Sequence, residues 1–307
     1  MTPIVTGFAM IVFAIGVGWL LGRRGVVKPA DRFVLNKVAF YAASPALLFT
    51  VLAKAQLREV FSTSLATHAV AVLVVCVGCY VLMRALGTKD VRQLRVASYS
   101  GVYSNANNIG LPIAVYVIGD GSQVAPLLVL QLVVMAPILM GILESMGAEG
   151  LNIRRLLLQP VINPIVLGSG LGVVFSAFSI PQPSWLMRPL ELVGGAAVPL
   201  MLIAFGISLV GQKPLQPGTG RRDVLIATVA KTVALPVLVY VLGRWVFGLD
   251  EQHLFAATVL GALPTAQNMY QYALRYECAE VVARDTVAIT TALAMPIALV
   301  AALFLRP

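Results

Sequence analysis

Charge is scarce in this sequence. Only 11% of its 307 residues are Asp, Glu, Lys or Arg, whereas 59% are hydrophobic and the mean hydropathy is +0.89. A soluble globular protein needs a polar surface, and this chain has too few polar residues to provide one. The composition therefore excludes a soluble domain and predicts an all-α membrane protein, whose main solvent is lipid.

Side chains for metal binding and catalysis are also few. The chain has two histidines, His68 and His253, and three cysteines, and it contains no H-E-x-x-H or G-x-S-x-G motif. Cys76 and Cys79 form a C-x-x-C inside an apolar segment without His or carboxylate partners. We therefore expect no enzyme, no metal site and no cofactor, and we interpret the cysteines as small packing residues.

Acidic residues are missing from the middle of the apolar segments. Asp120, Glu144, Glu191, Asp223 and Glu280 all fall at segment ends or in loops. A cation antiporter built on buried carboxylates is disfavoured for this reason, and a site of positive sign is favoured.

Long apolar stretches are what the sequence has in abundance. A helix of about 20 residues crosses a hydrocarbon core of about 30 Å. Ten stretches of this kind predict ten transmembrane helices, at residues 4–22, 33–53, 65–86, 96–118, 123–144, 157–178, 190–210, 224–247, 252–275 and 285–305.

The basic residues follow the predicted helices in a regular way. Most of the 22 Lys and Arg fall in alternate loops, and the opposite side holds only Lys54, Arg58, Arg188, Arg244 and Arg306. The positive-inside rule makes the richer side cytoplasmic, so we expect a multi-pass protein of the inner membrane with both termini outside the cytoplasm. This placement explains the net charge of +9 without a nucleic-acid partner. The first segment lacks a preceding positive charge, so it is interpreted as a retained helix rather than a signal peptide.

Intramembrane prolines recur in two matching sets, one in each half of the chain: Pro45, Pro112 and Pro137, then Pro199, Pro264 and Pro296. Their flanking residues also agree, as in Gly110-Leu111-Pro112 and Ala262-Leu263-Pro264. Each half contains five predicted helices, and an odd number makes the second half enter the membrane from the other side. The pattern predicts two inverted five-helix repeats, residues 1–150 and 151–307.

The fourth and ninth helices are predicted to be broken. Polar and helix-breaking residues gather in each at mid-depth: Asn105, Asn107, Asn108, Gly110 and Pro112 in the fourth, and Pro264, Thr265, Gln267 and Asn268 in the ninth. We expect each proline, Pro112 and Pro264, to open a second half-helix whose positive N-terminus favours an anion. The alternative is that these prolines only kink packed helices.

Three further polar residues lie within predicted helices. Lys231 is too deep to be a loop charge, so its ammonium either snorkels to the cytoplasmic surface or faces the crossover of the broken helices. There it would pair with carbonyls or a substrate carboxylate, or stand in for a bound cation. His68 is an interfacial histidine or a proton-coupling group. Gln131 is a second coupling candidate, bonded to a neighbouring helix.

These residues resemble the auxin efflux carrier family, which belongs with the bile-acid and sodium/proton antiporter folds. The resemblance spans the chain and is most specific at Asn108-Ile109-Gly110-Leu111-Pro112, at Lys231 followed by Pro236, at Pro264-Thr265-Ala266-Gln267-Asn268 with Ala273 and Tyr276, and at Thr290-Thr291 before Pro296. It implies a scaffold domain of helices 1, 2, 6 and 7 and a transport domain of helices 3–5 and 8–10. It also implies binding where helices 4 and 9 cross, elevator-type alternating access and a homodimer.

The short connection between the fifth and sixth helices, about residues 145–156, is typical of bacterial members. Because bacterial relatives include malonate and malate permeases, the resemblance implies secondary transport of small organic anions across the cell membrane, namely malonate- or malate-like carboxylates or auxin-like acids, rather than of auxin itself. Coupling to protons or sodium stays open. A passive channel and a membrane-embedded ligand sensor are the alternatives.

Overall fold

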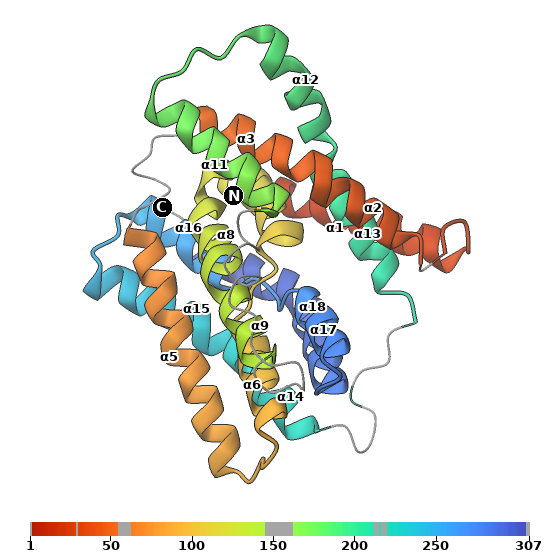
Figure 1. Cartoon of the computed structure of the whole chain (residues 1–307), viewed down its shortest axis with the longest axis vertical. Helices are drawn as coiled ribbons and strands as arrows, with labels where there is room; N and C mark the ends of the chain where they lie inside the picture. Colours follow the sequence, from red (N-terminus) through yellow and green to blue (C-terminus); the bar gives the residue numbers. More distant parts are fainter. Residues whose placement is uncertain are drawn as a thin grey trace. The chain divides into compact units, whose positions relative to one another are not determined.

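The computed structural model is helical almost throughout (Figure 1). It describes residues 2–28, 30–54, 63–144, 162–211, 215 and 220–304, and within these ranges no strand forms, only an isolated β-bridge. The predicted repeat boundary at residue 150, the first five residues of the sixth predicted helix, and Arg58, Arg154, Arg155, Lys213 and Arg306 lie outside the described residues.

Helix is present at each of the ten predicted positions. Five of the described helical segments are long and apolar enough to cross a membrane: 32–54, 63–85, 121–143, 184–207 and 221–246. Shorter apolar helices run over 9–23, 106–118 and 164–177. The division into two inverted five-helix repeats stays a prediction.

By internal contacts the chain forms two compact units, each assembled from both halves of the sequence. Unit 1 comprises residues 1–62, 107–129 and 158–212, and unit 2 comprises residues 63–106, 130–157 and 213–307. The helices of unit 1 are α1 (Thr2–Arg23), α2 (Arg32–Val38), α3 (Ser44–Lys54), α7 (Leu111–Ile113), α8 (Ala125–Val129), α11 (Pro164–Ala177), α12 (Ser184–Gly195) and α13 (Ala197–Ser208). Those of unit 2 are α5 (Thr63–Ala85), α6 (Val91–Ser100), α9 (Ala136–Glu144), α14 (Arg221–Val229), α15 (Leu235–Val241), α16 (Glu251–Gly261), α17 (Asn268–Arg275) and α18 (Glu280–Phe304).

Several prolines sit just after a wide, π-helical turn. Pro45, Pro112, Pro137 and Pro236 are each the second residue of an α-helical segment that follows such a turn. These turns are η1 (Ala39–Ala43), η2 (Ala106–Gly110), η5 (Leu130–Met135) and η6 (Ala230–Ala234). A proline lacks the N–H and its ring clashes with the carbonyl four residues earlier, and a π turn moves that carbonyl aside. At Pro45, Pro112 and Pro137, three of the intramembrane prolines of the predicted repeat, the helix therefore shows a local change of pitch, and Pro236 adds a fourth such position.

Glycines bring the helices of unit 1 into backbone contact. A Cβ on Gly18 of α1 would overlap the Ile203 carbonyl of α13, and one on Gly206 of α13 would overlap the Ile15 carbonyl of α1. Small residues at such crossings let membrane helices pack closely by van der Waals contact. This contact is needed because lipid is as apolar as the helix surface, so the hydrophobic effect does not drive the helices together.

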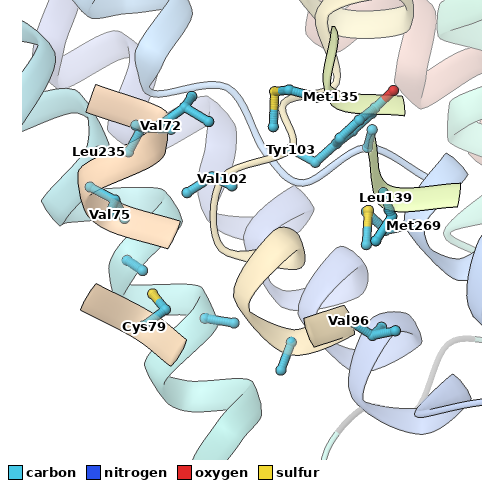
Figure 2. Packing of buried hydrophobic residues seen from close by; sticks show 14 of the residues in the cluster. Val72, Val75, Cys79, Val96, Val102, Tyr103, Met135, Leu139, Leu235 and Met269 are labelled. Atoms are coloured by element: carbon cyan, nitrogen blue, oxygen red, sulfur yellow. The ribbon is translucent and has the colours of Figure 1, made fainter. Parts of the chain in front are cut away.

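The core of unit 2 surrounds the chain between α6 and η2 (Figure 2). Tyr103 in that stretch is 1% exposed, and its ring meets Tyr272 of α17 edge-on, with 6.4 Å between ring centroids. Figure 2 shows Met135 beside it, with Leu139 and Met269 below. Helix α5 contributes the other labelled wall, Val72, Val75 and Cys79. The polar backbone of this stretch is thus held in an apolar, packed surrounding.

Candidate functional site

Both predicted helix breaks are present in unit 2, and they meet. Helix α6 ends at Ser100 and helical structure resumes at Ala106, while α16 ends at Gly261 and α17 begins at Asn268. The two irregular stretches run antiparallel and form the β-bridge between Ser104 and Thr265. They are buried, as non-helical backbone at membrane depth must be.

Main-chain hydrogen bonds join the two breaks. The Asn105 N–H donates to the Pro264 carbonyl at 2.8 Å, and the Ala266 N–H donates to the Tyr103 carbonyl at 2.9 Å. Backbone groups that left the helices are thereby satisfied by each other, which removes the several kcal/mol that each unpaired group would cost in a dry interior.

Side chains satisfy further backbone groups at the crossing. Thr265 is fully buried, and its Oγ1 donates to the Ser100 carbonyl at 2.7 Å while its N–H donates to Thr290 Oγ1 at 3.1 Å. Gln131 Nε2 donates to the Ser104 carbonyl at 2.8 Å, so this residue contacts the broken helix as the sequence indicated. Its role in coupling stays a prediction.

Lys231 is fully buried in η6. Its ammonium donates to the carbonyl of Gly261, the last residue of α16, at 2.9 Å. The side chain does not reach the surface, so the snorkelling alternative does not describe this structure. None of the ion pairs formed by the described residues includes Lys231, and no described carboxylate lies within 4.0 Å of its Nζ.

His68 of α5 is also buried, 2% exposed, and lies within electrostatic range of Lys231. Its Nδ1 is 2.9 Å from the Ser64 carbonyl, which can only accept, so Nδ1 carries the proton. The structure therefore places His68 inside the packed core of unit 2. Its depth in the membrane stays a prediction. Whether it couples protons stays a prediction.

The remaining predicted residues of the fourth helix belong to unit 1. Asn107 and Asn108 are half-buried in η2, and Gly110 and Pro112 are buried in the same helical run. Asn107 Nδ2 donates to Asn108 Oδ1 at 3.0 Å and contacts Met201 Sδ at 3.5 Å. Gln267 and Asn268, both half-buried, belong to unit 2 at the start of α17.

One expectation about the prolines is wrong. Helical structure resumes at Ala106, well before Pro112, and at Asn268, after Pro264, so neither proline opens a second half-helix. Pro112 follows a π turn inside a continuing helix. Pro264 lies within the irregular stretch, where its carbonyl accepts the hydrogen bond from the Asn105 N–H. The main-chain hydrogen bonds between the two stretches determine where the helices break, and a proline ring at the first position of the following helix does not.

Sequence reasoning missed a buried carboxylate and misjudged another. Asp285, in the second turn of α18, is fully buried and pairs with Arg284 at 2.8 Å. Asp223, in the first turn of α14, is 1% exposed and accepts from Thr88 at 2.9 Å and from Gln93 at 2.7 Å. Both stand beside an arginine in the sequence, and that adjacency was the available signal of a paired charge.

The fold and this arrangement define a polytopic membrane protein with crossed, broken helices. The chain belongs to the membrane transport protein family of auxin efflux carrier type, whose family model matches residues 3–302.

Two relatives carry transporter names. A protein of Rhizobium meliloti (strain 1021) named "Putative malonate transporter" is 25% identical over 308 residues, covering 95% of this chain and 92% of that protein. An "Uncharacterized transporter" of Methanothermobacter thermautotrophicus is 25% identical over 202 residues, covering 63% of this chain and 64% of that protein. This protein is accordingly a membrane-embedded transporter.

Proposed function

We propose that this protein is a secondary active transporter of small organic anions such as malonate and malate. The observation that carries the proposal is the crossing of the two helix breaks in unit 2, close to which Lys231 lies buried without a carboxylate partner among the described residues. Crossed, discontinuous helices near the middle of the protein are the usual substrate sites of secondary transporters.

The charge of this region favours an anion. Helix α17 starts directly after the break with no acidic residue in its first turn, so its positive end is not offset by its own side chains. Lys231 adds positive charge to the same unit. Support for a dicarboxylate comes from the name of the Rhizobium relative, which speaks of malonate.

Elevator-type alternating access is part of the proposal. It requires two separately packed bodies, and the two compact units, each made of helices from both halves of the chain, support it. We also keep the homodimer and the coupling of transport to protons or sodium as proposals, since the resemblance to the family implies the first and leaves the second open.

A counterflow assay in proteoliposomes tests the function. Vesicles loaded with unlabelled malonate should accumulate labelled malonate or malate transiently, and indole-3-acetate less strongly. Protein-free vesicles and protein-containing vesicles loaded with no carboxylate are the controls, and loading with succinate or lactate extends the substrate screen. A channel would give flux without counterflow, and a sensor would bind without flux, so either result contradicts a carrier. Repeating the assay with imposed pH and sodium gradients identifies the coupled ion.

A further inference from the structure

The two half-helices that precede the breaks end in the same way but are capped by different chemistry. The carbonyl of Ser100, the last residue of α6, accepts from the neutral hydroxyl of Thr265. The carbonyl of Gly261, the last residue of α16, accepts from the ammonium of Lys231. The final carbonyls of any helix need a donor. The first break shows that a hydroxyl meets that need, so hydrogen bonding alone does not explain a charged group at the second break.

A buried charge is costly, and little offsets this one. Lys231 is fully buried, and it forms no ion pair with any of the described residues. What faces it is the C-terminal end of α16, an eleven-residue helix whose aligned peptide dipoles place roughly half a negative charge there. The ammonium and the helix end therefore stabilise each other, and part of the positive charge is left over.

Carbonyls at the C-terminal ends of broken helices are the groups with which secondary transporters coordinate Na⁺. A second oxygen is available on the same helical run as Lys231. Thr228 lies about one turn earlier, is 5% exposed, and its Oγ1 has no hydrogen-bond partner among the described residues. His68, another basic group within electrostatic range, has its Nδ1 occupied by the Ser64 carbonyl, whereas the Gly261 carbonyl accepts from Lys231.

We infer that Lys231 is a built-in monovalent cation: its ammonium occupies the place of a sodium ion at the end of α16, so the carrier works without sodium, and removing the ammonium creates a site for a small cation. The inference rests on the proposed function and deepens it, because it excludes sodium as an ion that the transport cycle requires. It also leaves a net positive charge beside the break for an anionic substrate.

Thermal unfolding of the full chain in lipid nanodiscs tests this without any transport. Wild type and Lys231→Met are melted at constant ionic strength, with choline chloride replaced stepwise by sodium or lithium chloride. The wild-type melting temperature should be the same in all salts. Lys231→Met should melt lower in choline and recover by a few degrees along a saturable curve as Na⁺ or Li⁺ is added, because a cation that binds only the folded state stabilises it.

Arg244→Met is the matched control, since it removes one positive charge from an exposed position of η7 (Leu242–Val246) in the same unit. It should show no dependence on the cation. A folded Lys231→Met whose melting temperature is the same in choline, sodium and lithium overturns the inference, because the lysine is then only a hydrogen-bond donor.

A second measurement decides the matter even if Lys231→Met does not fold. Wild-type counterflow should proceed at the same rate in sodium-free choline medium as in sodium medium, and several-fold stimulation by sodium overturns the inference. If no carboxylate exchanges in any medium, the proposed function fails, while a sodium-independent wild type and a sodium-responsive variant in the melting experiment still support the built-in cation.

Discussion

At the scale of single residues, Asn107 has an amide N–H whose present acceptor is weak and can be replaced by a carboxylate oxygen of the substrate. One of its amide hydrogens serves Asn108 Oδ1, and the other faces Met201 Sδ at 3.5 Å. A thioether sulfur is a weak acceptor. A carboxylate oxygen would replace it with little loss and with the gain of a charge-assisted hydrogen bond.

We therefore predict that Asn107→Ala weakens malonate binding by about tenfold to a hundredfold, the effect of losing one hydrogen bond to a charged group, about 1.5–3 kcal/mol. Equilibrium binding of labelled malonate to the purified protein measures it. Met201→Leu, which conserves the volume and removes only the sulfur, should bind as wild type does. An unchanged dissociation constant in Asn107→Ala would exclude this amide from the site.

At the scale of helices, the packing of α1 on α13 rests on a pair of glycines. Gly18 and Gly206 each allow a backbone carbonyl of the other helix to approach where a Cβ would stand. Gly16, on the same helix as Gly18, has open space around the position of a Cβ.

Gly18→Ala should therefore lower the melting temperature of the purified protein markedly, because the helices must separate and lose contacts along their whole interface; overpacking typically costs 1–3 kcal/mol. Gly16→Ala should be neutral or slightly stabilising, since alanine is the better helix former. Differential scanning fluorimetry in detergent compares the two. Equal melting temperatures for Gly18→Ala and Gly16→Ala would show that the close approach carries no stability.

The positions of the helices and the existence of two breaks could be predicted from the sequence, because apolar length and clustered Gly, Pro and Asn are local signals. The ends of the breaks could not. Whether the fourth helix resumes at Ala106 or at Pro112 depends on the hydrogen bonds from Asn105 to Pro264 and from Ala266 to Tyr103, which join parts of the chain that are far apart in sequence.

Only part of the environment of the candidate site could be predicted from the sequence. The unusual depth of Lys231 is visible in the sequence, but its partner, the Gly261 carbonyl, is a backbone group that has no sequence signature. Asp285 was overlooked because it stands at a predicted helix start, where carboxylates are ordinary. Its complete burial follows from packing, as does the close approach at Gly206.

At the scale of the whole molecule, the distribution of basic residues predicts the orientation in the membrane. The loop between α5 and α6, which contains Lys89, should be cytoplasmic, and the start of α16 at Gln252 should face the outside. Both residues are exposed, so either can be labelled when replaced by cysteine.

Cysteine accessibility in intact cells measures this orientation. On a background without Cys76, Cys79 and Cys278, Gln252→Cys should react with an impermeant maleimide, and Lys89→Cys should react only after the membrane is permeabilised. The reverse pattern would place both termini in the cytoplasm and would contradict the positive-inside assignment.

The bridge between the two breaks has a consequence for which amino-acid substitutions this protein can accept during evolution. Its two hydrogen bonds, from Asn105 to Pro264 and from Ala266 to Tyr103, run between main-chain atoms. Such bonds impose no requirement on side-chain identity apart from the need for an N–H at the two donors. The bridge itself therefore leaves the side chains of its four residues open to change, whereas Thr265 and Gln131, whose side chains satisfy backbone groups at the crossing, must be kept. New substrates can then be acquired by substitution without rebuilding the broken helices that present them.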